Sequence, residues 1–195
     1  MTAAAPAFVY LASRSPRRRE LLAQVGIAHE LVDAGVDETP RADEPPRDYV
    51  IRLARAKAAA GWRSVSAAGL RRAPVLAADT TVALDARIFE KPLDRADAER
   101  MLAALSGRRH EVFTAIAMQL GDHCKTALSA SEVEFAPLDA EEIRRYVASG
   151  EADDKAGAYG IQGRAAAFIV EIRGSYTGVM GLPLYETSQL LGRLS

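Results

Sequence analysis

The chain has 195 residues, 49% of them apolar, which is enough to bury a sizeable core within one domain and argues against disorder. Its 25 Lys and Arg residues nearly balance its 26 Asp and Glu residues, so a formal net charge of −1 argues against long-range attraction to nucleic acid. The one cysteine, Cys124, excludes an internal disulfide, and residues 1–7 lack the pattern of a signal peptide. We therefore expect a soluble, cytoplasmic protein with no nucleic-acid or membrane partner.

The first predicted elements are a strand at residues 8–12 and a helix that starts beside its end. Ser15 is a good N-cap, and Pro16 suits the first helical position because an N–H there has no intrahelical partner. Residues 17–19 are all arginine, although the helix dipole already makes this end positive. A bound polyphosphate would relieve the repulsion. Alternatively, the three side chains extend into solvent, where screening makes the repulsion tolerable.

Predicted strands and helices alternate along the rest of the chain, and no repeat or linker divides it. Extended segments are expected at residues 28–36, 74–78 with 82–84, 88–92, 111–120, 125–135 and 167–172, the fourth and fifth forming an antiparallel pair. Helices are expected at residues 47–61, 94–107, 139–149 and from about 183 onward. This pattern predicts a mixed α/β fold with a central sheet flanked by helices.

Asp79 is the leading candidate for chemistry, because it is predicted to emerge at the carboxyl end of the buried strand 74–78. Ligand sites of α/β sheets usually lie at such ends. Thr80 and Thr81 add two hydroxyls, and Lys91 returns on the next segment. A carboxylate there can hold a metal ion or accept a proton from water. The alternative is an aspartate that only opens a turn.

Other polar residues carry weaker signals. Loop acids such as Glu38 and Asp154 are either ligands of Mg²⁺ or Mn²⁺ or merely solvated. Lys57 is interpreted as a surface lysine whose stem covers the border of an apolar helix face. His110, shortly after a predicted helix end, is interpreted as a polar loop residue.

Several enzyme classes lose support from spacing alone. The glycine-rich stretch 157–163 reads G-x-x-G-x-x-G, which matches neither the dinucleotide-binding fingerprint nor the P-loop. The three histidines lack zinc-site spacing, and no G-x-S-x-G elbow indicates a serine hydrolase.

Six short motifs, in order along nearly the whole chain, resemble those of the Maf family. Each motif is weak alone, but the ordered set is specific. They are Ser13-x-Ser15-Pro16-Arg17-Arg18, Ala78-Asp79-Thr80, Glu90-Lys91-Pro92, His110-x-Val112-x-Thr114, the stretch 154–163 and Gly181-Leu182-Pro183-Leu184.

The resemblance implies metal-dependent hydrolysis of a nucleoside triphosphate to the monophosphate and pyrophosphate. It also implies a Maf/ITPase-like fold, a single domain over residues 1–195 whose mixed sheet is split into two lobes by a deep cleft. The Gly-Ile-Gln-Gly form of residues 160–163 resembles the branch that acts on dTTP and UTP, rather than on 7-methyl-GTP. The implied cofactor is Mg²⁺ or Mn²⁺. A homodimer is compatible with the sequence, which does not fix the oligomeric state.

The resemblance assigns roles residue by residue. Asp79 matches the proton acceptor, and Lys91 joins it as a catalytic cation. Substrate contacts are expected from Ser13, Arg17, Arg18, Lys57, Thr80, Lys155 and Gln162. Metal contacts are expected from Glu38, Asp79 and Asp154. The base and metal roles of Asp79 both stay open, because a carboxylate that binds Mg²⁺ loses much of its basicity.

Two positions depart from the family pattern: Arg14 replaces a small residue, and Ala115 replaces a glycine.

Two other functions also stay open. One is a nucleotide-sensing regulator of septum formation without turnover, and the other is a nucleotidyl or phosphoryl transferase. Asp79 and Lys91 favour the hydrolase, because binding alone requires no base.

Overall fold

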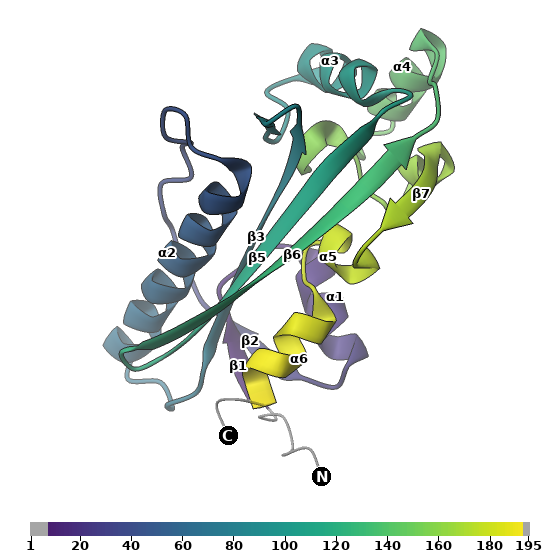
Figure 1. Cartoon of the computed structure of the whole chain (residues 1–195). Helices are drawn as coiled ribbons and strands as arrows, with labels where there is room; N and C mark the ends of the chain where they lie inside the picture. Colours follow the sequence, from purple (N-terminus) through teal and green to yellow (C-terminus); the bar gives the residue numbers. More distant parts are fainter. Residues whose placement is uncertain (1–7, 193–195) are drawn as a thin grey trace.

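The computed structural model describes residues 8–192, which form one seven-stranded mixed sheet with helices on both faces (Figure 1). The strands lie in the order β2-β1-β3-β5-β6-β7, with β4 also beside β3. Their bounds are β1 (Phe8–Leu11), β2 (Ala28–Leu31), β3 (Val75–Leu84), β4 (Arg87–Phe89), β5 (Arg109–Leu120), β6 (His123–Phe135) and β7 (Ile169–Arg173). The predicted mixed α/β fold with a flanked central sheet is confirmed. Residues 1–7, where no signal peptide was expected, lie outside the described part.

The helices divide between the two faces and one end of the sheet (Figure 1). Their bounds are α1 (Pro16–Gln24), α2 (Pro46–Ala67), α3 (Arg95–Leu105), α4 (Ala140–Ala148), α5 (Tyr176–Met180) and α6 (Leu184–Gly192), with short 3₁₀ turns η1 (Ala156–Ala158) and η2 (Arg164–Phe168). Between residues 8 and 192, no helix is both long enough and apolar enough to cross a bilayer.

Three apolar clusters follow from the alternation of side chains along β3. Val75 and Ala77 face α2, while Leu76 and Ala78 face α1 and α6 on the opposite side. Further along the strand, Val82 and Leu84 belong to a third cluster with α3 and α4. The third cluster forms a lobe at the far end of the sheet from β1 and β2 (Figure 1).

The edge of β3 that faces β1 is paired only at its two ends. β1 pairs with this edge at Val75 and Leu76, and β4 pairs with it from Val82 to Leu84. Residues 77–81 pair with β5 on their other side, but neither β1 nor β4 pairs with them. The strand therefore crosses between the two lobes with one open edge.

The position of Asp79 corrects the sequence interpretation, which placed it at the end of a strand. β3 runs without a break from Val75 to Leu84, and Asp79 is paired in mid-strand with Ala115 of β5. The physical reason is the long antiparallel ladder with β5, which continues through Thr80 and Thr81, both of a residue type that favours strands.

Capping residues in the sequence correctly predicted where α1, α3 and α4 begin. The Asp94 side chain accepts a hydrogen bond from the backbone N–H of Asp97, and Asp139 forms the predicted capping box with Glu142. At α1, Ser15 is the N-cap residue and Pro16 opens the helix, but the Ser15 side chain makes no capping bond. The helix α5 was missed, because its five residues give no periodic signal.

The sequence suggested that His110 is a loop residue, but the structure places it in a strand. It lies in β5, where it is 2% exposed, and burial lowers its pKa to about 4. Its Nε2 atom lies 2.8 Å from the hydroxyl oxygen of the buried Tyr159. The pair fixes the glycine-rich stretch 157–163 against the third cluster, where Tyr159 also contacts Phe135 edge to face.

Candidate functional site

A cleft of about 760 Å³ lies along the open edge of β3. One wall comes from the segment 12–18 and the loop 32–38, and the other from residues 90–93 and 154–161. Asp79 and Thr80 both line the cleft although they point to opposite faces of the sheet, because the cleft wraps around the unpaired edge. The arrangement agrees with the predicted cleft between two lobes.

Asp79 lies on the α2 face, with its side chain only 8% exposed. Its Oδ1 atom accepts a hydrogen bond of 2.7 Å from the Lys57 ammonium, which also lies 3.0 Å from Oε1 of Glu38. Burial raises the pKa of the Asp79 carboxyl, while the positive charges of Lys57 and Arg18 oppose that rise. The pairing favours a carboxylate that stays ionised although little water reaches it.

Lys57 is therefore not the surface lysine that its helix pattern suggested. Its side chain is 12% exposed and points from α2 to Asp79. Helical periodicity cannot distinguish a surface lysine from one that is paired in the interior. The partner of Lys57 is Asp79, which lies on a strand 22 residues further along the chain.

Arg18 lies on the other face, and four of its five guanidinium N–H groups bind the protein. Its guanidinium donates to the carbonyl oxygens of Ala78 and Gly181, both at 2.8 Å, and to the hydroxyls of Ser13 at 3.0 Å and Thr80 at 3.2 Å. Burial lowers the pKa of Arg18. The bond to Ala78 occupies a carbonyl on the open edge of β3, so Arg18 replaces part of the missing neighbouring strand.

The hydroxyl of Thr80 is fixed by the same network. Thr114 donates to the carbonyl oxygen of Gly178 at 2.7 Å, so its only proton is used there. The contact of 2.9 Å between the two threonine hydroxyls then requires Thr80 to donate to Thr114. Since Arg18 can only donate, Thr80 presents the cleft with acceptor capacity alone.

The three consecutive arginines have three different environments. Arg17 is half-buried and lines the cleft, and its buried Nε has no hydrogen-bond partner among the described residues. Arg18 is held by the protein, and Arg19 is exposed. An unpaired guanidinium N–H beside a helix N-terminus fits an anion. The solvent alternative therefore holds only for Arg19.

The opposite wall carries further cations. Lys155 pairs with Asp154 at 2.5 Å, and Lys91 lines the cleft as an exposed side chain. Gly160 makes room between the walls, since an added Cβ would lie 2.8 Å from Cε of Lys155 and 3.4 Å from Nη1 of Arg17.

Gln162 does not line the main cleft. It is exposed and lines an adjoining pocket of about 290 Å³, together with Arg17, Lys155 and the two glycines Gly160 and Gly163. The cleft and this pocket share Arg17 and Lys155 among their lining residues, so the two spaces adjoin at those side chains.

The three predicted metal ligands are not preassembled. Among residues 8–192, no group of three or more His, Cys, Asp or Glu side chains is arranged to hold a metal ion. Glu38 and Asp79 meet through Lys57, whereas the side chain of Asp154 is 68% exposed and paired with Lys155.

Tyr49 and Glu90, which the sequence analysis did not name as site residues, also line the cleft. The buried Tyr49 donates from its hydroxyl to the carbonyl oxygen of Glu38 at 2.9 Å, and the same hydroxyl oxygen lies 3.2 Å from Oε1 of Glu90. Tyr49 precedes Lys57 by two helical turns on α2, and this register was the signal available in the sequence.

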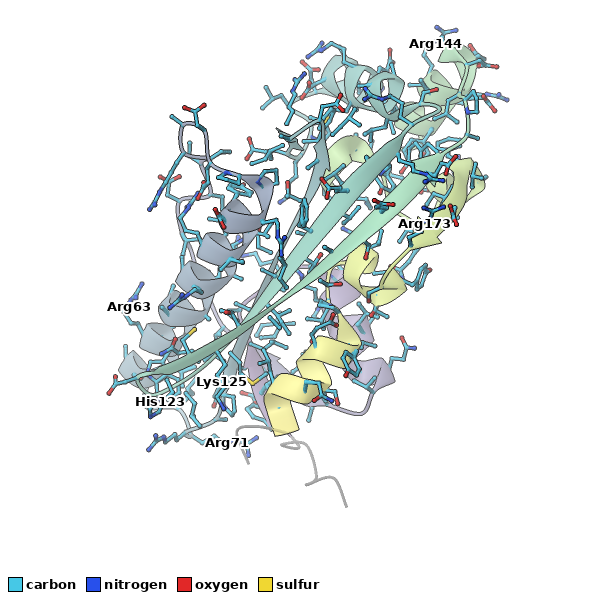
Figure 2. All side chains as sticks on the ribbon, viewed as in Figure 1. Arg63, Arg71, His123, Lys125, Arg144 and Arg173 are labelled. Atoms are coloured by element: carbon cyan, nitrogen blue, oxygen red, sulfur yellow. The ribbon has the colours of Figure 1, made fainter. Side chains whose placement is uncertain are left out.

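The two residues that depart from the family pattern lie at the rim of the cleft and in the core. Arg14 is 94% exposed and pairs with Asp33 at 3.2 Å, on the rim of the cleft. Ala115 is fully buried directly opposite Asp79 on β5. Figure 2 shows other cations, such as Arg63 on α2 and Arg144 on α4, at the periphery of the molecule.

A family model described as Maf-like protein matches residues 8–194, nearly the whole chain. The chain belongs to the Maf family. Among curated relatives in that family, the dTTP/UTP pyrophosphatase of Aromatoleum aromaticum is 57% identical, over 94% of this chain and 93% of its own length. Those of Nitrosomonas europaea and Ralstonia nicotianae are 53% and 52% identical, over 94% and 98% of this chain and 92% and 96% of their own lengths.

Among solved structures, the Ham1 protein of Staphylococcus aureus is 18% identical to this Maf-family chain. The match covers 66% of this chain and 72% of the other, with a TM-score of 0.44, which is too remote for a functional argument.

The arginine environments predict opposite effects on stability. Arg18→Ala removes the donor for two carbonyls and two hydroxyls, so we expect it to lower the free energy of unfolding by roughly 2–4 kcal/mol. Arg17→Ala, the matched control, removes repulsion at the start of α1 and should change that energy by only a few tenths of a kcal/mol, in the stabilising direction. Urea unfolding of the nucleotide-free variants measures both, and equal losses would contradict this assignment.

Proposed function

We propose that this protein is a nucleoside triphosphate pyrophosphatase that hydrolyses dTTP and UTP to the monophosphate and pyrophosphate. The observation that carries the proposal is the buried Asp79–Lys57 pair at the open edge of β3, in a cleft lined by cations. Membership of the Maf family and relatives of 52–57% identity named dTTP/UTP pyrophosphatase support it.

Asp79 is the proposed general base. In the proposed reaction, a water oxygen attacks the α-phosphorus, the bond to the bridging oxygen of pyrophosphate breaks, and Asp79 accepts the proton that the water loses. The carboxyl must be ionised before the attack, and Lys57 stabilises that form at 2.7 Å. Burial makes the same carboxylate a better proton acceptor than it would be in water.

Cations on both walls compensate the charge that grows on pyrophosphate as it leaves. Arg17 lines the cleft from the α1 side, while Lys91 and Lys155 line it from the other lobe. Donors held in place before the reaction need no reorganisation when the charge develops. Arg18, in contrast, contributes its positive charge and holds the β3 edge, because four of its five N–H donors are already used.

The residues present fit a metal ion that is shared with the substrate. Mg²⁺ prefers oxygen ligands and commonly takes one or two carboxylates together with phosphates, and the half-exposed Glu38 provides such a carboxylate while Asp79 acts as the base. A bound ion would polarise the phosphates and neutralise part of their charge. Asp154 requires a change of partner to join this set, because Lys155 occupies its carboxylate.

The proposed base preference rests on the pocket beside the cleft. Gln162 offers both a donor and an acceptor, as the N3–H and O4 edge of uracil or thymine requires. Its place beside Arg17 and Lys155 leaves room for a base next to bound phosphates.

Asp79→Asn should keep the fold but lower turnover by about 10²–10⁴-fold, because the amide retains the shape and removes the base. Pyrophosphate release from UTP with Mg²⁺ or Mn²⁺ measures turnover, and thermal unfolding checks the fold. Asp122→Asn, in the turn between β5 and β6, is the matched control and should retain full activity. Near-normal activity of the Asp79 variant would refute the assignment.

Gln162→Ala should reduce the preference for dTTP and UTP over CTP, ATP and GTP more than it lowers the best rate. A group that reads the base edge rejects a mismatch at roughly 1–3 kcal/mol per unpaired group. The measurement is kcat/KM for the five triphosphates with both proteins. If all five fall by the same factor, Gln162 only supports the glycine-rich stretch.

A further inference from the structure

The loop at residues 32–45 brings Glu38 to the cleft without any helix or strand of its own. Glu38 has a half-exposed side chain, and its ion pair is the one with Lys57 at 3.0 Å. Because that carboxylate is otherwise solvated, its position depends on where the loop backbone is held. The residues that bind the loop backbone therefore fix the position of the Glu38 carboxylate.

Two residues of α2, one turn apart, bind the backbone on either side of this point. Tyr49 donates to the carbonyl oxygen of Glu38 at 2.9 Å, and Arg52 donates to that of Thr39 at 3.2 Å. The Arg52 guanidinium also lies over the Tyr49 ring, 5.5 Å from its centroid. Tyr49 and Arg52 therefore contact each other and together bind the loop backbone at two adjacent residues.

Arg52 also binds the far end of the loop through Glu44. Its Nε and Nη2 atoms donate to the two carboxylate oxygens of Glu44, both at 2.6 Å, in a bidentate pair. The Glu44 side chain is 8% exposed, and its Oε2 atom accepts a further bond from the backbone N–H of Arg41. The hydrogen bonds from Arg52 lower the pKa of Glu44 to about 2. This pair stays ionised across the working range of most proteins.

We propose that Arg52 is a positioning residue for Glu38: its pair with Glu44 and its bond to Thr39 fix the loop so that the Glu38 carboxylate stays beside Asp79. Arg52 and Glu44 do not line the cleft, whereas Glu38 does, so Arg52 acts through the loop and not on substrate. The inference rests on the proposed function, in which Glu38 holds the metal ion beside the base Asp79.

The main test is the Mg²⁺ concentration that gives half-maximal pyrophosphate release from UTP. Arg52→Ala should raise it about 3–10-fold, while kcat at saturating Mg²⁺ and UTP stays within about twofold, because the base and the cations of the cleft are untouched. Arg52→Lys should be intermediate, since an ammonium keeps the charge but loses the bidentate geometry. Arg63→Ala, on the outer side of α2 (Figure 2), is the matched control and should change neither value.

Coupling to Glu38 separates positioning from a general loss of stability. Glu38→Gln alone should raise the Mg²⁺ requirement, and Arg52→Ala in that background should add nothing, because there is no carboxylate left to position. Additive effects, or an Arg52 variant with normal Mg²⁺ dependence, would overturn the proposal. So would a Glu38 variant with normal Mg²⁺ dependence, and that outcome would also remove Glu38 from the proposed metal site while leaving the activity in place.

Two measurements do not depend on turnover. Titration of Mn²⁺ into protein saturated with a non-hydrolysable UTP analogue should show weaker binding for Arg52→Ala and unchanged binding for Arg63→Ala. Trypsin should cut the bond after Arg41 faster in Arg52→Ala, because the loop is released. If wild-type protein released no pyrophosphate, the proposed activity would fail, while unchanged Mn²⁺ affinity and cleavage rate in Arg52→Ala would overturn the positioning role.

Discussion

The open edge of β3 is the constraint on which the site depends. β1 and β4 pair with the two ends of this edge and leave residues 77–81 free, so a cleft can reach both faces of one strand. Asp79 then meets α2 on one face, and Thr80 meets α1 on the other. An unpaired edge normally leaves buried carbonyls without partners. Here the Arg18 guanidinium binds the carbonyl of Ala78, which explains why a cation lies in the first turn of a helix.

The charges around the buried Asp79 carboxyl favour its ionised form. Burial raises the pKa of Asp79, and Lys57 opposes that rise from α2 at 2.7 Å. The same ammonium holds Glu38, so three charged side chains from a helix, a strand and a loop form one network. Such a network is costly to bury unless each member has a partner, and here each has one. A triphosphate in the cleft would meet both this network and Arg17, which also lines the cleft.

Sequence reasoning succeeded where the deciding interactions are local. The capping residues Asp94 and Asp139 set the starts of α3 and α4, and alternation predicted the β5–β6 pair. It failed where pairing between distant segments decides the outcome. The ladder with β5 made one strand from two predicted segments, and pairing with Val133 of β6 placed His110 in a buried strand. The assignments of Asp79, Lys57 and Arg17 to one site came from the family resemblance, because their contacts join elements far apart in the chain.

The measurement that tests this account most directly is the pH dependence of kcat/KM for UTP in Lys57→Met. The base must be deprotonated, so activity falls as the pH drops through the pKa of Asp79, which burial raises and Lys57 lowers. Removing the ammonium should therefore shift the acidic limb to higher pH, whereas Lys91→Met, which removes another cation of the cleft, should leave the limb in place. An acidic limb that is unchanged in Lys57→Met would contradict the claim that the Asp79–Lys57 pair supplies the base.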